Sequence, residues 1–154
     1  MKISGTHSLP VPQQRAYDLL QDPVVLAKCM PGCDTLEKIA EHEYHMKMKM
    51  MLASVSGLFD GKVRIADLQP TSSFRLIVEG SGKIGFMKGD GLLTLSPAGG
   101  GTEVQYDGSV EVGGTIAAVG QRLLDTTARM IIKRFFEKLV SEIAASADAA
   151  GSPA

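Results

Sequence analysis

The feature that most constrains this chain is a long stretch without proline near its C-terminal end, residues 114–145. At 100° per residue it has one polar and one broad apolar face. The apolar face consists of Ile116, Leu123, Leu124, Thr127, Met130 and Ile131. A helix this long exceeds the average of about 11–12 residues, and its apolar face needs a large partner. Because most of the preceding chain alternates like β-strand, we predict a sheet wrapped around this helix.

One charged residue interrupts the apolar direction of the predicted helix. Arg134 projects in the same direction as Leu123 and Met130, and after it Phe135 and Phe136 turn the apolar direction by most of a quarter turn. One interpretation is that Arg134 points into an internal space and meets a polar group there. The other is that its aliphatic stem lies on the apolar surface while its guanidinium reaches water.

The rest of the chain predicts an α+β fold with one strand, two short helices and about six further antiparallel strands before the long helix. Proline and glycine clusters separate these elements. The expected strands are 2–9, 35–40, 43–52, 57–68, 74–79, 84–96 and 104–112, and the expected short helices are 13–20 and 23–30. We predict a single domain over residues 1–145 and a disordered tail over 146–154.

The composition and net charge restrict the functional classes to which the chain can belong. The chain has 154 residues, of which 44% are hydrophobic and 21% charged, and a net charge of −1. These values are typical of a globular domain and lack the basic footprint of a nucleic-acid-binding protein. No apolar run is long enough to cross a bilayer and no signal-peptide pattern follows Met1. We therefore expect a cytoplasmic protein.

The glycine motif at residues 80–85 matches G-x-G-x-x-G, which in dinucleotide-binding proteins leads into a helix. Here the following residues, 86–93, are spaced like a strand. We therefore interpret the motif as a bend between strands rather than as a nucleotide site.

The titratable residues do not form a recognisable catalytic or metal-binding set. His7, His42 and His45 are the only histidines, and the last two would face opposite sides of a strand. Cys29 and Cys33 have neither redox nor zinc-site spacing, so we expect ordinary reduced thiols. The carboxylates expected on solvated strand faces are Asp60, Asp67, Glu79 and Asp90. We expect no cofactor, no bound metal and no enzymatic activity.

A stripe of methionines is the clearest hint of a binding site. Met46, Met48 and Met50 alternate with His45 and polar residues, so they share one strand face. A curved sheet with few bulky rings and many glycines leaves room for an apolar cavity between sheet and helix. The stripe is then either a pliable lining for a flexible apolar ligand or plain core packing; both place it inward.

Several short motifs, in order, resemble the carbon monoxide dehydrogenase CoxG family within the START-like helix-grip superfamily. The residues that carry this resemblance are Met30-Pro31-Gly32-Cys33, Gly57-Leu58-Phe59-Asp60-Gly61-Lys62-Val63, Gly80-Ser81-Gly82, Val112-Gly113-Gly114, Gly120-Gln121-Arg122-Leu123-Leu124 and Phe135-Phe136. The resemblance spans about residues 1–145. It implies a curved sheet of about seven antiparallel strands that grips the C-terminal helix.

The resemblance also implies a non-catalytic accessory to a molybdenum hydroxylase of the carbon monoxide dehydrogenase type. It would bind a hydrophobic small molecule, a quinone or lipid, and carry it, with at most transient contact at the inner face of the membrane. The alternative is an assembly or membrane-recruitment factor that acts through its surface. The predicted lining is Met46, Met48, Met50, Phe59, Val63, Leu76, Phe86, Tyr106, Leu123, Thr127, Met130 and Ile131, with Arg134 as the polar contact.

Overall fold

The computed structural model of the protein describes the backbone of residues 1–52 and 55–150 and the side chains of residues 1–51 and 56–145. A strand and two short helices precede six strands, a short 3₁₀ helix and a long C-terminal helix. The elements are β1 (Lys2–Leu9), α1 (Gln13–Leu19), α2 (Pro23–Cys29), β2 (Cys33–Ala40), β3 (Glu43–Leu52), β4 (Val55–Gln69), β5 (Ser73–Gly82), β6 (Gly85–Ala98), β7 (Gly101–Gly113), η1 (Thr115–Val119) and α3 (Gln121–Ala150).

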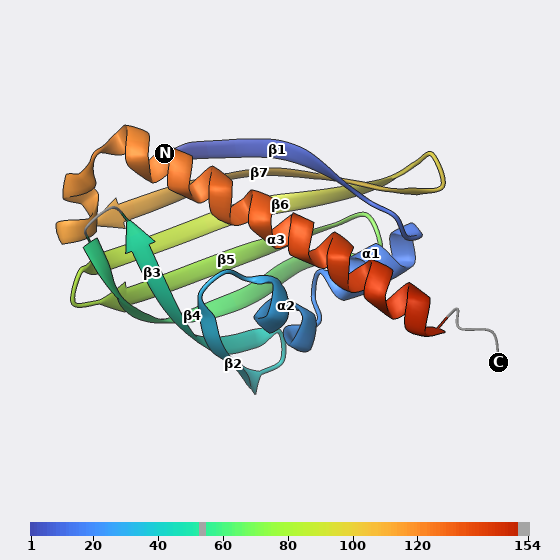
Figure 1. Ribbon diagram of the computed structural model, residues 1–154, viewed down its shortest axis with the longest axis horizontal. Coiled ribbons are helices and arrows are strands. Elements are labelled where there is room, and N and C mark those ends of the chain that lie inside the picture. Colours follow the sequence, from blue (N-terminus) through green and yellow to red (C-terminus); the bar gives the residue numbers. More distant parts are fainter. Residues whose placement is uncertain (53–54, 151–154) are drawn as a thin grey trace.

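The seven strands form one antiparallel sheet in the order β1-β7-β6-β5-β4-β3-β2. Strands β2 to β7 follow one another as hairpins, and β1 pairs with β7 at the far edge. All three α-helices lie on one side of this sheet, and α3 runs diagonally across it (Figure 1). The structure confirms the predicted α+β helix-grip architecture.

Local sequence signals explain the two short helices. Pro12 and Pro23 stand at helix starts, where a missing N–H costs nothing. The Asp22 carboxylate accepts a hydrogen bond of 2.9 Å from the Val24 backbone N–H and so caps α2. The Tyr17 hydroxyl of α1 donates to the Ser73 carbonyl at 3.1 Å, which ties α1 to the start of β5.

The long helix differs from its predicted bounds. It begins at Gln121 rather than at residue 114, because Gly114 and Gly120 adopt φ values of 84° and 99°, which lie outside helical geometry and favour glycine. Ile116, expected on the helix, lies instead in η1, buried, and its N–H donates to the Ile84 carbonyl at 2.7 Å. At the other end α3 continues to Ala150. The rest of the expected tail, residues 151–154, lies outside the described residues.

The most deeply buried side chains gather mainly where α1, α2 and the second half of α3 meet the sheet. Leu9, Ala16, Phe74, Val104 and Leu139 are all essentially inaccessible to solvent. Gln13 donates to the carbonyls of Thr71 and Leu95, which closes this end of the molecule. The hydrophobic core is therefore densest at the end of the sheet that carries the short helices.

Candidate functional site: the inner face of the sheet

The inner face is the side of the sheet that faces α3, and strand alternation identifies its residues. On β4, Phe59, Val63 and Ile65 are buried, whereas Asp60, Lys62 and the other alternate residues are exposed. The pairing register extends this face across the sheet. On β3 to β7 its members are almost all apolar or glycine, and they include Tyr44, Met46, Met48, Met50, Phe59, Gly61, Val63, Ile65, Phe74, Leu76, Val78, Gly80, Met87, Gly89, Gly91, Leu93, Leu95, Val104, Tyr106, Gly108, Val110 and Val112.

The inner face is not buried evenly. Phe74 and Leu95 at the α1 end are fully covered, but the central residues remain partly accessible to solvent. These half-buried residues are Leu76, Val78, Met87, Leu93, Tyr106 and Val112 on the sheet and Leu123 and Ile131 on α3. The main backbone contacts of α3 are with α2, β1, β3 and η1, rather than with β4, β5 or β6. The backbone of α3 therefore approaches the sheet most closely at its margins.

Two glycines mark the least crowded part of the inner face. A Cβ added to Gly89 would meet only Ser109 and Val110 of the neighbouring strand, both at 4.0 Å. A Cβ added to Gly91 would meet only β7 backbone, at 3.7 Å or more. No atom of α3 lies within 4 Å of either position, so the middle of the sheet offers a floor without side chains and with room above it.

Most of the predicted lining residues lie on the inner face or on the covered side of α3. The buried members are Met46, Met48, Met50, Phe59, Val63 and Thr127, and the half-buried members are Leu76, Tyr106, Leu123 and Ile131. The methionine stripe is inward, as both of its interpretations required. Whether these residues contact a ligand stays a prediction.

Two predicted lining residues are misplaced. Phe86 is 38% exposed and lies on the outer face, because the inner residues of β6 are Met87 and the odd-numbered positions after it. Met130 is 39% exposed, because the buried side of α3 is turned toward Phe135, Phe136 and beyond, where the helix meets β1 and α2. Neither residue lines the inner face in this structure.

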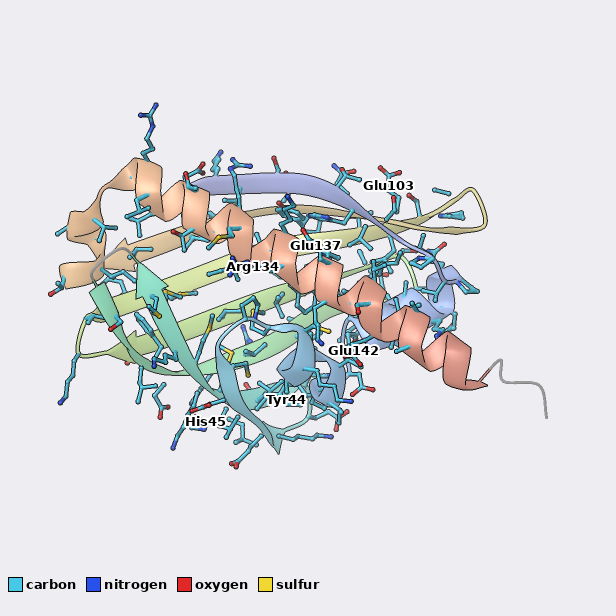
Figure 2. All side chains as sticks on the ribbon, viewed as in Figure 1. Tyr44, His45, Glu103, Arg134, Glu137 and Glu142 are labelled. Carbon is cyan, nitrogen blue, oxygen red and sulfur yellow. The ribbon has the colours of Figure 1, made fainter. Side chains whose placement is uncertain are left out.

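Arg134 is exposed and belongs to no ion pair among the described residues. In Figure 2 its side chain lies along the margin of α3, with the central strands behind it. This placement agrees with the interpretation in which the guanidinium reaches water. It also leaves the positive charge at the border between α3 and the half-open inner face.

A histidine packs on the inner side of the sheet. His7 of β1 stacks on Phe136 of α3 with ring centroids 4.2 Å apart, and on Tyr106 of β7 at 5.9 Å. Burial lowers the pKa of His7, and the Glu137 carboxylate partly opposes this effect. His7 is thus favoured as a neutral ring packed between aromatic neighbours.

The outer face is a charged, solvated surface. Side chains of alternating charge lie directly opposite one another across the strands, as in the row Lys62, Glu79, Lys88 and Glu111. The carboxylates predicted on solvated strand faces, Asp60, Asp67, Glu79 and Asp90, are all exposed.

The remaining motifs have structural placements. The glycine motif at 80–85 forms the β5–β6 turn, with Gly82 opposite Gly85 and a strand rather than a helix after it. Cys29 is buried and Cys33 half-buried, both as free thiols, and burial raises the pKa of each. Within residues 1–52 and 55–150, no group of three His, Cys, Asp or Glu side chains is placed to hold a metal ion.

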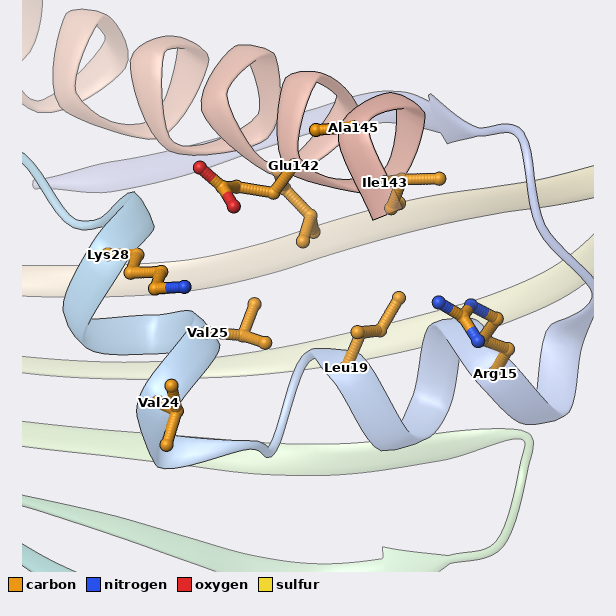
Figure 3. Close-up of a pocket in the computed structure, with 9 residues that line it drawn as sticks. Arg15, Leu19, Val24, Val25, Lys28, Glu142, Ile143 and Ala145 are labelled. Atoms are coloured by element: carbon orange, nitrogen blue, oxygen red, sulfur yellow. The ribbon is translucent and has the colours of Figure 1, made fainter. Parts of the chain in front are cut away.

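Among the described residues, two pockets can be outlined, and neither is lined by both α3 and the central strands of the sheet. One, of about 350 Å³, is a wedge between α1, α2 and the end of α3 (Figure 3). It is lined by Arg15, Leu19, Val24, Val25, Lys28, Leu139, Glu142, Ile143 and Ala145. The other, of about 390 Å³, is a shallow depression over β5, β6 and β7. The second pocket is lined by Val78, Gly89 and Val110 of the inner face and also by outer-face residues such as Lys88 and Glu111, so neither of these two pockets is the predicted cavity between sheet and helix.

Sequence comparison identifies one family over nearly the whole chain. The family model that describes the carbon monoxide dehydrogenase protein CoxG matches residues 5–144. No curated protein matches the chain in sequence. In the described part of the chain, no helix is both long and apolar enough to span a membrane.

Solved structures support the same fold. A conserved protein from Geobacillus kaustophilus is 35% identical, with a TM-score of 0.90 over 95% of this chain and 97% of that one. A protein from Chromobacterium violaceum is 22% identical, with a TM-score of 0.67 over 91% of this chain and 95% of that one. The protein named Ara h 8.0201 is 13% identical, with a TM-score of 0.67 over 94% and 97%. The last two show the fold alone.

Proposed function

Because the chain belongs to the carbon monoxide dehydrogenase CoxG family, we propose that it is a non-catalytic protein that binds a hydrophobic small molecule on its inner face. The observation that carries this proposal is the open floor at Gly89 and Gly91, where a Cβ added to either glycine would have no α3 atom within 4 Å. Half-buried apolar side chains surround it. Covering such a surface with a ligand stabilises the complex by about 25 cal/mol for each Å² of apolar area removed from water.

The proposed ligand is a quinone or a lipid. A flat ring needs a surface without protruding side chains, and the glycine floor provides one. A long apolar tail needs a lining that adapts to it, and Met87 and Leu93 flank the two glycines along β6. We further propose that the protein carries this molecule for a molybdenum hydroxylase of the carbon monoxide dehydrogenase type, and the support for this partner is that the family description names carbon monoxide dehydrogenase.

The absence of catalysis is likewise part of the proposal. In the described part of the chain, His7 packs against aromatic rings and forms no hydrogen bond or ion pair with a carboxylate, and the half-buried Cys33 thiol lies on β2, at the opposite edge of the sheet. General acid–base chemistry needs a partner group within hydrogen-bond reach of the reacting atom. Ligand binding alone requires no such pair of acid and base groups on the inner face.

The test is ligand uptake by wild type and by a variant that fills the floor. The purified protein is examined by native mass spectrometry and organic extraction, and is then titrated with a short-chain ubiquinone. Gly91→Leu places a bulky side chain on the inner face and should abolish uptake. Thr94→Leu adds the same side chain on the outer face of the same strand and should leave uptake unchanged.

Two results would count against the proposal. Uptake that is equal in Gly91→Leu and wild type would place the ligand elsewhere. An empty protein that takes up neither quinone nor lipid would favour the alternative, a factor that acts through its surface.

A further inference from the structure

One end of the sheet carries an unusual share of the exposed apolar side chains. Six large apolar side chains are exposed in the described part of the chain, and three of them, Met51, Leu58 and Phe86, lie at this end. Met51 and Leu58 are 68% and 64% exposed. The ends of β3 and β5, the starts of β4 and β6, and η1 all meet here (Figure 1). We call this end, residues 49–51, 56–58, 81–87 and 113–122, the sheet tip.

Close contacts hold the parts of the sheet tip together. Leu58 lies directly opposite Lys49 on the outer face. The backbone of Gly82 packs so closely against Leu58 that a Cβ on Gly82 would lie 2.1 Å from the Leu58 carbonyl oxygen. The Phe86 ring occupies the space where Gly113 lacks a side chain. The exposed apolar groups therefore lie on strands of one sheet rather than on separate loops.

The sheet tip is positively charged although the whole chain is not. Lys49, Lys83 and Arg122 lie within it, all exposed, and its residues include no Asp or Glu. The chain as a whole has a net charge of −1, so the remainder is net negative. The next outward residue of β4 is Asp60, whose carboxylate is bonded to His45. An anionic surface would consequently attract this end of the protein and repel the rest.

We propose that the sheet tip docks on an anionic lipid bilayer. Exposed apolar patches next to cationic side chains mark surfaces that bind membranes. Met51 and Leu58 can enter the boundary between head groups and acyl chains, while Lys49 and Lys83 bury their stems and keep their ammonium groups at the phosphates. A protein partner would call for a contiguous apolar centre, whereas here lysine and serine side chains separate the apolar ones.

Docking at the sheet tip is compatible with the proposed ligand-binding role, and the docking proposal depends on that role only in part. Ile84, Val112 and Leu123 are half-buried apolar residues at the same end of the molecule. A bilayer that touches the tip would lie next to this edge of the inner face, so that an apolar molecule could pass between them with little exposure to water. Vesicle binding is measured without any added ligand, and Gly91→Leu should keep it while losing ligand uptake.

The experiment is co-sedimentation with vesicles of phosphatidylcholine alone and of phosphatidylcholine mixed with an equal part of phosphatidylglycerol, at low salt. Wild type should sediment with the anionic vesicles only. The double variant Met51→Ser/Leu58→Ser should reduce binding about tenfold or more. Its matched control is Val24→Ser/Ile39→Ser, since these residues are 62% and 51% exposed and lie on α2 and β2; this control should bind like wild type.

A second pair of variants tests the charge. Lys49→Gln/Lys83→Gln should weaken binding about fivefold for each lysine, whereas Lys62→Gln/Lys88→Gln, in the middle of the outer face, should have little effect. Unchanged thermal unfolding of each variant shows that the fold is intact. The proposal is overturned if wild type ignores anionic vesicles, if tip and control variants bind equally, or if the tip variants instead abolish self-association seen by light scattering.

Discussion

The open floor of the inner face makes a quantitative prediction about two neighbouring glycines. Gly91 on β6 and Gly108 on β7 lie directly opposite each other. A Cβ on Gly91 would lie 3.7 Å from the Asp107 carbonyl oxygen, which is ordinary van der Waals contact. A Cβ on Gly108 would lie 2.5 Å from the Asp90 carbonyl oxygen and 2.8 Å from the Gly91 Cα, both of which are backbone atoms that cannot move aside alone.

The two alanine variants should therefore change stability in opposite directions. Glycine within a strand costs about 0.5–1 kcal/mol relative to alanine, and Gly91→Ala recovers this without a clash. Gly108→Ala recovers the same amount but pushes the backbone apart, which typically costs about 1–3 kcal/mol. We expect Gly91→Ala to raise Tm by about 1–4 °C and Gly108→Ala to lower it by several degrees, since 1 kcal/mol corresponds to about 2–4 °C in a domain of this size.

The assay is reversible unfolding by urea, followed by far-UV circular dichroism, with thermal melts as a second readout. Equal slopes for wild type and both variants would show that the free energies of unfolding can be compared. The reasoning fails if Gly91→Ala loses as much stability as Gly108→Ala. Such a result would mean that the space above Gly91 is already filled, and it would remove the main support for a ligand there.

Two further predictions concern the packed part of the molecule. Burial lowers the pKa of His7 despite the nearby Glu137. The unfolded state therefore binds more protons below about pH 6.5, and the free energy of unfolding falls as the pH drops through that region. His7→Phe keeps the aromatic stack and should make the free energy of unfolding in urea depend less on pH, and an unchanged pH dependence would contradict this. The buried Thr102 hydroxyl donates to the Val11 carbonyl at 2.8 Å, so Thr102→Val should lose about 1–3 kcal/mol in urea unfolding, whereas Thr94→Val, at an exposed position, should lose almost nothing.

The sequence is sufficient for the order of elements and for the faces of most strands. On β3, methionines alternate with histidine and lysine from His45 to Met50, so a period of two determines both the strand and its inward side. Turn residues separate the hairpins, and sequential hairpins can form few other sheets. The resulting antiparallel sheet agrees with the structure.

The prediction of an inward Phe86 fails for a reason that the sequence does contain. It rests on the size and apolar character of this side chain, but Lys88 and Asp90 follow on the same alternation and are exposed. The inner positions are instead Met87, Gly89 and Gly91, and two of these have no side chain. Alternation is a stronger guide than hydrophobicity at this strand, and it also reveals the glycine floor.

The wrong start of the C-terminal helix and the wrong placement of Met130 have a different origin. The prediction includes Gly114 and Gly120 in the helix because no proline intervenes, yet both adopt positive φ, and a glycine at such a position ends regular helix. The inward placement of Met130 rests on periodicity alone. Which part of an apolar stripe is covered depends on where the helix rests, and α3 rests on α2 and β1, a contact between distant segments that no local pattern specifies.

The α1 end of the interior is more deeply buried than the centre of the sheet, and this difference explains how an incompletely filled sheet can still be stable. Side chains such as Leu9, Phe74 and Leu139 are fully covered at the α1 end, where truncation of one leucine typically costs about 2–5 kcal/mol. The central residues around Gly91 have fewer contacts to lose, so changes there should affect binding before they affect folding. A carrier needs this separation, because its site must be empty for part of each cycle without loss of the fold.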